Sequence, residues 1–327
     1  MANYTVNCRP DRPLYAGLLG HSARGFGSVM NNALGAYQVA VAAGRRFQLV
    51  SHHWEYESLA TFFEDFAIHT ACPLFDELSD PEADALLKNQ DAYSASYTKG
   101  TVAVTGNFDV APLHLTQRFQ DLHDILQKLY DTDRDGSFLT KSLLTKAMWQ
   151  LRSELRDFVK VLLYPIITAG GFIGVHMRRT DKISLKEMGD IPVQHYADKV
   201  NSIAENKSLP KVVYIMTDER SAYDELERSL ANTSYSIYGF ESLIKLRNFE
   251  PTEIFDRPME QLNHSVSYTD RDYWSKQTGQ LIVELTILSL ADDVVCTMSS
   301  NLCRFLALLR GAREGTIHSL DSCWGPL

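Results

Sequence analysis

The chain has 327 residues, more than one small hydrophobic core usually holds, so two domains are expected. Its composition, with 45% hydrophobic and 22% charged residues, is that of an ordinary globular protein. The formal charge of −9 argues against a general nucleic-acid binder, which needs a basic surface, but is compatible with a local basic site for one anionic ligand. No apolar run approaches the ~20 residues that span a bilayer.

The first half of the chain predicts helices around one short strand. A glycine-punctuated turn at Gly25-Phe26-Gly27 precedes a helical pattern over residues 31–43, and residues 47–50 follow as a strand. Residues 141–163 predict one long helix that ends at Pro165, because proline disfavours the helical conformation of the residue before it.

The second half alternates short apolar runs with helical patterns. Three apolar runs are typical of buried parallel strands: residues 171–176, 212–216 and 293–297. Three segments of helical spacing lie among them: residues 195–204, 221–230 and 281–290. Strands that alternate with helices predict an α/β fold with a doubly wound parallel sheet, in which ligands bind beyond the carboxyl ends of the strands.

A polar cluster follows each of these runs, so the clusters would meet at one edge of the sheet. They are Arg178-Arg179-Thr180-Asp181, Thr217-Asp218-Glu219 and Thr297-Met298-Ser299-Ser300. We expect two lobes: residues 1–165, which are helical with a small sheet, and residues 166–327, which contain the doubly wound sheet.

The strongest candidate for chemistry is the segment His176-Met177-Arg178-Arg179-Thr180-Asp181-Lys182. Arginine presents a planar, permanently charged fork that matches phosphate oxygens. An arginine aimed at the β-phosphate of a sugar nucleotide would stabilise the charge that develops there as the glycosidic bond breaks. A salt-bridge cluster of arginine and aspartate that holds a loop accounts for the same residues equally well.

Two further segments could bind phosphate through backbone N–H groups. Gly25 and Gly27 precede a helix, whose positive end attracts anions, although a tight turn is the favoured interpretation. Ser299 and Ser300 lie at a strand-to-helix turn, where an ordinary N-cap is the alternative.

The sequence carries only weak signals for a metal. Residues 131–136 match the opening of an EF-hand calcium loop, but Ser142 stands where the bidentate glutamate belongs, so a solvated acidic connection between helices is favoured. None of the five cysteines forms a CxxC pair, and the histidines show no ligand spacing. We expect no metal site.

Taken together, these elements resemble the core α1,6-fucosyltransferases and the related bacterial chitin-oligosaccharide fucosyltransferases. The similarity runs in order from Cys8 to Gly325. Six elements at similar spacing carry it: Gly25-Phe26-Gly27, Trp54-Glu55-Tyr56, and residues 174–182, 214–218, 296–304 and 318–321.

The resemblance implies a GT-B glycosyltransferase with GDP-fucose between an acceptor-side first lobe and a Rossmann-like second lobe that binds the donor. It implies inverting transfer of L-fucose to the 6-hydroxyl of a GlcNAc residue in an N-glycan core or chitin-type oligosaccharide, with no cofactor and no metal. The expected partners are then GDP-fucose and the oligosaccharide, with no nucleic acid and no membrane contact from this chain.

The resemblance also assigns site residues. His176 and Glu284 would contact the guanine, Tyr56 the ribose and Arg178 the β-phosphate. Further contacts with the donor fall on Gly25, Phe26, Gly27, Arg179, Ser299 and Ser300. The fucose and the acceptor would be organised by Asp181, Lys182 and Asp218.

One departure from the family concerns the catalytic base. The family's proposed base is a glutamate four residues after the motif lysine, where this chain has Lys186. Glu187 is adjacent and is our candidate for the base. Asp181 is the alternative, and Glu187 would then be a solvated loop residue.

The cysteines bear on the compartment. The resemblance implies the disulfides Cys296–Cys303 and Cys8–Cys72, which leave Cys323 free. Together with Asn-x-Ser/Thr sequons such as the one at Asn206, these disulfides favour a secretory enzyme of the Golgi lumen whose membrane anchor lies outside this sequence. A cytoplasmic protein is the alternative.

Two other functions fit the same motifs. A protein O-fucosyltransferase has a similar basic motif but acts on a folded domain. A catalytically inactive GDP-sugar-binding protein is the other, because it would not need the family's glutamate, which Lys186 replaces here.

Overall fold

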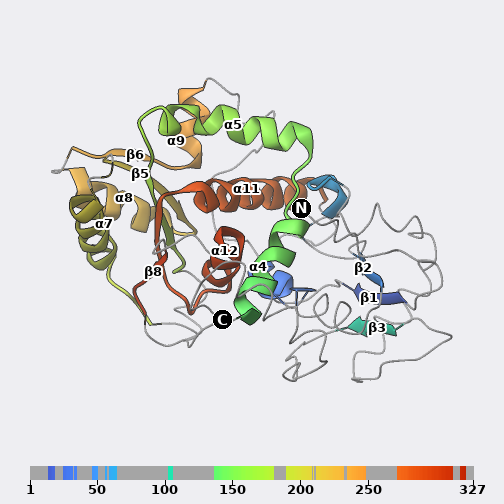
Figure 1. Cartoon of the computed structure of the whole chain (residues 1–327). Coiled ribbons are helices and arrows are strands. Elements are labelled where there is room, and N and C mark those ends of the chain that lie inside the picture. Colours follow the sequence, from blue (N-terminus) through green and yellow to red (C-terminus); the bar gives the residue numbers. More distant parts are fainter. Residues whose placement is uncertain are drawn as a thin grey trace. The chain divides into compact units, whose positions relative to one another are not determined.

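The computed structural model divides into two compact units, Met1–Arg152 and Ser153–Leu327 (Figure 1). The residues that it describes are 14–18, 25–31, 33–34, 46–50, 56, 59–64, 102–105, 136–179, 189–207, 209, 211–231, 234–247, 271–311 and 317–321. The boundary precedes the one expected at residue 165, because helix α5 (Ser153–Ile167) packs against α11 (Arg271–Leu290) and so belongs to the second unit.

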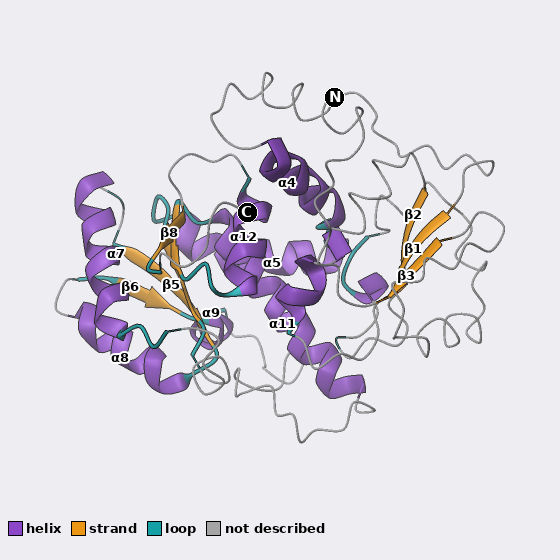
Figure 2. Cartoon of the chain, turned by 90° about the horizontal axis from the view of Figure 1, so that it is seen from below, coloured by secondary structure: helices purple, strands orange, loops and turns teal. Residues whose placement is uncertain are grey.

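The first unit contains a three-stranded parallel sheet in the order β2-β1-β3 (Figure 2). Its strands are β1 (Leu14–Leu18), β2 (Arg46–Val50) and β3 (Val102–Thr105). Residues 26–31 and 33–34 are helical, as are η1 (Leu59–Thr61) and α4 (Gly136–Met148).

The long helix expected over residues 141–163 is in fact two helices, α4 and α5. Between them, the N–H of Glu64 donates to the carbonyl of Gln150 (2.7 Å) and the N–H of Arg152 donates to the carbonyl of Phe62 (3.0 Å). These bonds to another segment replace helical ones and interrupt the helix. Pro165 lies inside α5, which ends at Ile167, so the expected stop at the proline was wrong by only a few residues.

The second unit is built on a five-stranded parallel sheet in the order β6-β5-β4-β7-β8, which confirms the predicted α/β fold. Its strands are β4 (Ile173–Met177), β5 (Val212–Thr217), β6 (Ser236–Tyr238), β7 (Asp293–Cys296) and β8 (Ile317–Ser319). Central strand β4 is buried along its whole length, as expected for a strand covered on both faces.

Helices cover both faces of this sheet (Figures 1 and 2). On one face, α7 (Val193–Lys207) and α8 (Arg220–Ala231) bury a core that includes Ile173, Val175 and Met177 of β4. On the other lie α5, α11 and α12 (Asn301–Arg310). A short helix, α9 (Phe240–Leu246), follows β6. β4 approaches α11 so closely that a Cβ on Gly174 would lie 2.6 Å from Leu288, which only glycine avoids.

A buried arginine caps the carboxyl end of α11. Arg310, at the end of α12, is 3% exposed, and its Nη1 donates to the carbonyls of Leu288 (3.1 Å), Ser289 (3.3 Å) and Ala291 (2.6 Å). Its Nη2 donates to the carbonyl of Asp292 (2.9 Å). The last carbonyls of a helix have no partner within it, and a cation there also complements the helix dipole. Arg310 therefore ties α11 to α12.

We predict that Arg310→Ala lowers the free energy of unfolding by about 3 kcal/mol, because it leaves buried carbonyls without a charged donor. Arg310→Met, which restores most of the apolar stem, should recover only a minor part of the loss. Urea unfolding measures both, with Arg228→Ala on the exposed face of α8 as a control expected to stay within about 0.5 kcal/mol of wild type. A loss below about 1 kcal/mol in Arg310→Ala would contradict this role.

Candidate functional site

The strand order places a ligand site at one edge of the second unit's sheet. Chain order builds outward from β4 to β5 and β6 on one side, then returns to β7 and β8 on the other. The direction of winding therefore switches between β4 and β7, and in such sheets ligands bind beyond the carboxyl ends of the strands at this switch. The arginine pair follows β4, and Ser299 and Ser300 follow β7.

Arg178 is held at this edge by the end of β5. Its Nη1 lies 2.8 Å from Asp218 Oδ2, and both side chains are largely buried, at 18% and 8% exposed. The other oxygen, Oδ1, accepts from the backbone N–H of Arg179 (2.9 Å). Asp218 therefore fixes the direction of the Arg178 guanidinium.

Arg179 is bound by three further partners. Its Nε donates to Glu219 (2.8 Å) and its Nη1 to the carbonyl of Ile191 (2.9 Å). Its Nη2 lies 3.0 Å from Asp190. The salt-bridge interpretation of the arginine pair thus describes the contacts of Arg179 in this structure. Asp190 was not singled out in the sequence, and its position before α7 gave no local signal for the contact.

His176 is a buried histidine that stays neutral. It lies two residues after Gly174 on β4 and so shares the face that α11 covers. Burial lowers the pKa of His176 to about 4; the charge of Asp218 opposes this shift and that of Arg178 adds to it. Among the described residues, nothing bonds its Nδ1. A neutral imidazole offers one donor and one acceptor to a ligand without adding charge.

Glu284 of α11 is a second buried titratable group on this face. Its Oε1 accepts from the Tyr214 hydroxyl (3.1 Å) and its Oε2 from the Gln280 amide (3.3 Å). Burial raises the pKa of Glu284 to about 8; the hydrogen bonds from Gln280 and Tyr214 only partly offset it. Gln280, one helical turn earlier, could have been found from its i, i+4 spacing. Two buried polar groups with shifted pKa values near a sheet edge are typical of a functional site.

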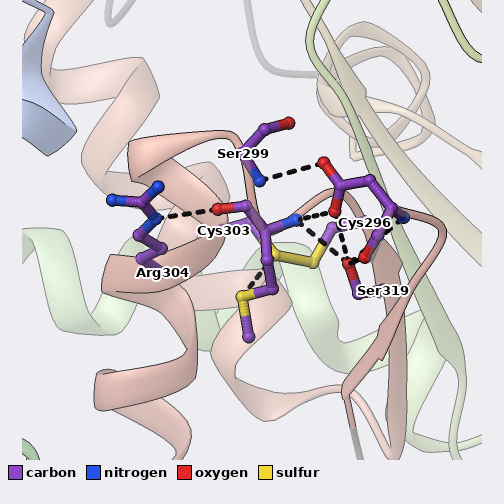
Figure 3. Close-up of a disulfide and its surroundings, with 7 residues drawn as sticks. Cys296, Ser299, Cys303, Arg304 and Ser319 are labelled. Atoms are coloured by element: carbon purple, nitrogen blue, oxygen red, sulfur yellow. Dashed lines mark hydrogen bonds between the residues drawn. A yellow bond between two sulfur atoms is a disulfide. The ribbon is translucent and has the colours of Figure 1, made fainter. Parts of the chain in front are cut away.

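The turn between β7 and α12 is fixed by covalent and polar contacts (Figure 3). Cys296 and Cys303, the pair that the resemblance implies, form a disulfide across it. Arg304 Nε donates to the carbonyl of Met298 (2.8 Å). The fold thus holds the backbone of the turn from both ends.

Asp321, just after β8, binds the N–H groups of this turn. Its two carboxylate oxygens accept from the backbone N–H groups of Met298 (2.7 Å) and Ser299 (3.0 Å), and Oδ1 also accepts from the Ser319 hydroxyl (2.6 Å). Burial alone would raise the pKa of Asp321, but the hydrogen bonds from Ser299, Ser319 and Met298 outweigh it and hold the pKa below its ordinary value. The Ser299 N–H is therefore occupied by the chain's own carboxylate.

Ser300 is the N-cap residue of α12, but its side chain makes no capping hydrogen bond. The alternative of an ordinary side-chain N-cap therefore does not describe this serine.

In the first unit, four candidate donor-binding residues are described. The carbonyl of Gly25 accepts from the N–H groups of Ser28 (2.9 Å) and Val29 (3.2 Å), so Gly25 directly precedes a helix that begins at Phe26. The turn expected over Gly25-Phe26-Gly27 was therefore wrong for Phe26 and Gly27, which already lie in the helix. The ring of Phe26 packs edge-on against Tyr56, at 5.6 Å between centroids, and both side chains are buried. Gly27 is buried in the helix. These contacts make Phe26 and Tyr56 part of this unit's core.

Several candidates lie outside the described residues. They are Asp181, Lys182, Glu187, Cys8, Cys72 and most of the acidic segment 131–136. Within the described ranges, no group of three or more His, Cys, Asp or Glu side chains is arranged to hold a metal ion. No described helix is both long enough and apolar enough to cross a bilayer.

Comparison with known proteins agrees with the resemblance. No family model matches the chain. The α-(1,6)-fucosyltransferase of Caenorhabditis elegans is 28% identical over 165 residues, which are 47% of this chain and 25% of that protein. The match thus spans about a quarter of the length of that curated relative. Over this segment the chain is similar to an α-(1,6)-fucosyltransferase.

Solved structures show the same fold. The fucosyltransferase NodZ from Bradyrhizobium is 16% identical, with 91% of this chain and 93% of that chain covered at a TM-score of 0.50. POFUT1 in complex with GDP is 11% identical, with 94% and 98% covered at a TM-score of 0.53. The chain thus shares the α/β fold of these solved fucosyltransferase structures.

We predict that Asp321→Asn lowers the free energy of unfolding at pH 7 by about 1–3 kcal/mol, because an amide offers one acceptor oxygen where the carboxylate offers two. The folded-state pKa of Asp321 is depressed, so its contribution is present above the unfolded-state pKa of about 4 and is lost as the pH falls through the folded-state value. Urea unfolding should show the difference at pH 7 and a smaller one below about pH 4. The control is Asp224→Asn on α8, whose side chain is 47% exposed. An unchanged stability at pH 7 would exclude this role.

Proposed function

We propose that the chain is an inverting fucosyltransferase that moves L-fucose from GDP-fucose to the 6-hydroxyl of a GlcNAc residue in an N-glycan core or chitin-type oligosaccharide. The observation that carries the proposal is the arrangement at the switch point. The buried, neutral His176 lies on β4, and Arg178, whose direction is fixed by Asp218, comes directly after that strand. The similarity to an α-(1,6)-fucosyltransferase supports the reaction and its linkage.

Arg178 would stabilise the leaving group. As the bond to fucose breaks, negative charge grows on the β-phosphate, and an arginine whose direction is already fixed stabilises that charge without reorganisation. Asp218 supplies the fixed direction. Ser300, whose hydroxyl does not cap α12, is a second candidate contact with the phosphates. In this proposal the arginine and helix ends act in place of a metal.

His176 and Glu284 would recognise the base. Guanine presents two adjacent donors, N1–H and N2–H, which match the two oxygens of one carboxylate. Helix α11 contacts β4 at Gly174 through Leu288, and Glu284 lies one turn, about 6 Å, before Leu288. His176 lies two strand residues, about 6.6 Å, beyond Gly174. The two side chains would then face the same base from helix and strand.

The acceptor side of the proposal rests on residues named from the resemblance. Glu187 would take the proton of the acceptor hydroxyl, with Asp181 as the alternative base, and Lys182 and Asp181 would organise the fucose. A secretory enzyme of the Golgi lumen fits a glycan acceptor and the disulfide between Cys296 and Cys303. The likeness to POFUT1 keeps transfer to a folded protein domain as the second candidate.

The test is an assay with GDP-fucose and a panel of chitin oligosaccharides, N-glycans and folded domains, read by mass in excess EDTA. The proposal expects one fucose on an oligosaccharide and none on the domains. Transfer to a domain alone would favour the second candidate, and absence of both transfer and donor hydrolysis would favour an inactive binding protein. Turnover that needs added calcium or manganese would overturn the metal-free mechanism.

We predict that the protein binds GDP in preference to UDP and releases a proton as it does so. Glu284 is mostly protonated at pH 7, because its pKa is raised to about 8, but must be ionised to accept two N–H groups. GDP affinity should therefore rise between pH 7 and 8 and level off above it. Calorimetry in two buffers of different ionisation enthalpy measures the proton.

The matched variant for this prediction is Glu284→Gln. It should weaken the affinity for GDP by about 10–100-fold, which corresponds to the loss of a charged hydrogen bond of about 1.5–3 kcal/mol. It should also abolish the pH dependence of that affinity. UDP binding as tight as GDP, or a wild-type affinity that is flat over this pH range, would remove Glu284 from base recognition.

We predict that Arg178→Ala lowers kcat/KM by about 100-fold or more, as the loss of a preorganised charge contact does. Arg178→Lys should not restore full activity, because an ammonium cannot reproduce the fork. The double variant Arg178→Ala with Asp218→Asn removes the unpaired carboxylate and should remain inactive. Near-normal turnover in the alanine variant would exclude Arg178 from the mechanism.

A further inference from the structure

The contacts of Arg179 differ from those expected of a phosphate ligand. All three guanidinium nitrogens have partners within the chain: Glu219 at 2.8 Å, the carbonyl of Ile191 at 2.9 Å and Asp190 at 3.0 Å. Two of these partners are carboxylates, so the charge of Arg179 is already balanced. A diphosphate could replace them only by breaking charge-assisted hydrogen bonds and by approaching two acidic groups.

The partners of Arg179 lie on two different parts of the fold. Glu219 follows β5 directly after Asp218, the residue that orients Arg178. Asp190 and Ile191 lie where the chain enters α7. Arg179 lies two residues after β4 and directly before residues 180–188, and Asp190 and Ile191 lie after them. The side chain of Arg179 therefore joins the chain on both sides of residues 180–188. Fixing both ends of a segment reduces the conformational entropy that it must lose to hold one arrangement.

We infer that Arg179 is a positioning residue, which fastens the two chain ends that flank residues 180–188 to the end of β5 and makes no contact with the donor's phosphates. The inference rests on the proposed function only in that Asp181, Lys182 and Glu187 fall within that segment. In this role Arg179 affects catalysis through their placement, while Arg178 carries the charge that meets the donor. The two neighbouring arginines thus have different tasks.

Replacement of Arg179 should therefore reduce kcat and spare nucleotide binding. Arg179→Gln should lower kcat by about 10–100-fold, the scale on which a misplacement of about 1 Å acts, while the Kd of GDP changes less than twofold. Arg179→Lys keeps the charge, but its single nitrogen cannot reach partners that lie around three separate guanidinium nitrogens, so it should rescue only part of the activity. The control is Arg220→Gln, an exposed arginine paired with Asp224 and Glu241, which should leave both constants unchanged.

Partner variants separate this role from donor binding. Glu219→Gln should reproduce a large part of the kcat defect, and its combination with Arg179→Gln should be far from additive, because both remove one network. Asp190→Asn removes a carboxylate that is 61% exposed, so it should fold normally and give a smaller defect of the same kind. A Kd of GDP raised tenfold or more in Arg179→Gln, with Glu219→Gln normal, would make Arg179 a donor ligand and overturn the inference.

A readout without turnover tests the inference separately from the proposed function. Amide hydrogen exchange in a peptide covering residues 189–195, which contains the Asp190 and Ile191 partners, should speed up at least fivefold in Arg179→Gln and Asp190→Asn, and stay as in wild type in Arg220→Gln. This result would stand even if the wild-type protein transferred no fucose. Unchanged exchange in Arg179→Gln, or full activity of that variant in an active protein, would contradict the positioning role.

Discussion

Parallel pairing brings the carboxyl ends of β5, β4, β7 and β8 to one edge of the second unit's sheet. Strand β4 is buried from Ile173 to Met177, so the first residue after it, Arg178, is also the first that can present a charge at that edge. The acidic end of β5 lies beside it and the hydroxyl-bearing turn after β7 on its other side. Three clusters that are far apart in the sequence thus become one candidate anion site.

Within the described part of the chain, most charged groups at this edge are paired with other groups of the protein. Asp218 binds Arg178, Glu219 and Asp190 bind Arg179, and Asp321 binds the turn after β7. Such pairing offsets the cost of removing charges from water and makes the arrangement rigid. His176 and Glu284 are different, because burial disfavours their charged forms. It lowers the pKa of His176 to about 4 and raises the pKa of Glu284 to about 8. A ligand that supplies hydrogen bonds to both would relieve this cost.

The sequence predicted what depends on local pattern. Buried apolar runs identified β4, β5 and β7, and their ends identified Arg178, Asp218, Ser299 and Ser300. The sequence did not predict contacts between distant segments. These are the hydrogen bonds from Arg310 to the carbonyls at the end of α11 and the hydrogen bond from the Ser299 N–H to Asp321. They also include the hydrogen bonds between residues 62–64 and residues 150–152 that interrupt the helix before α5. Each of these depends on where a distant segment packs, which spacing within one element does not encode.

A crystal structure of the chain with GDP tests the central claim, that the carboxyl edge of the second unit's sheet is a guanine nucleotide site. The account predicts that the β-phosphate lies within hydrogen-bond distance of Arg178 and that the guanine N1–H and N2–H donate to the Glu284 carboxylate. It also predicts that Arg179 makes no contact with a phosphate. GDP bound at another place, or bound here with its base away from His176 and Glu284, would contradict it.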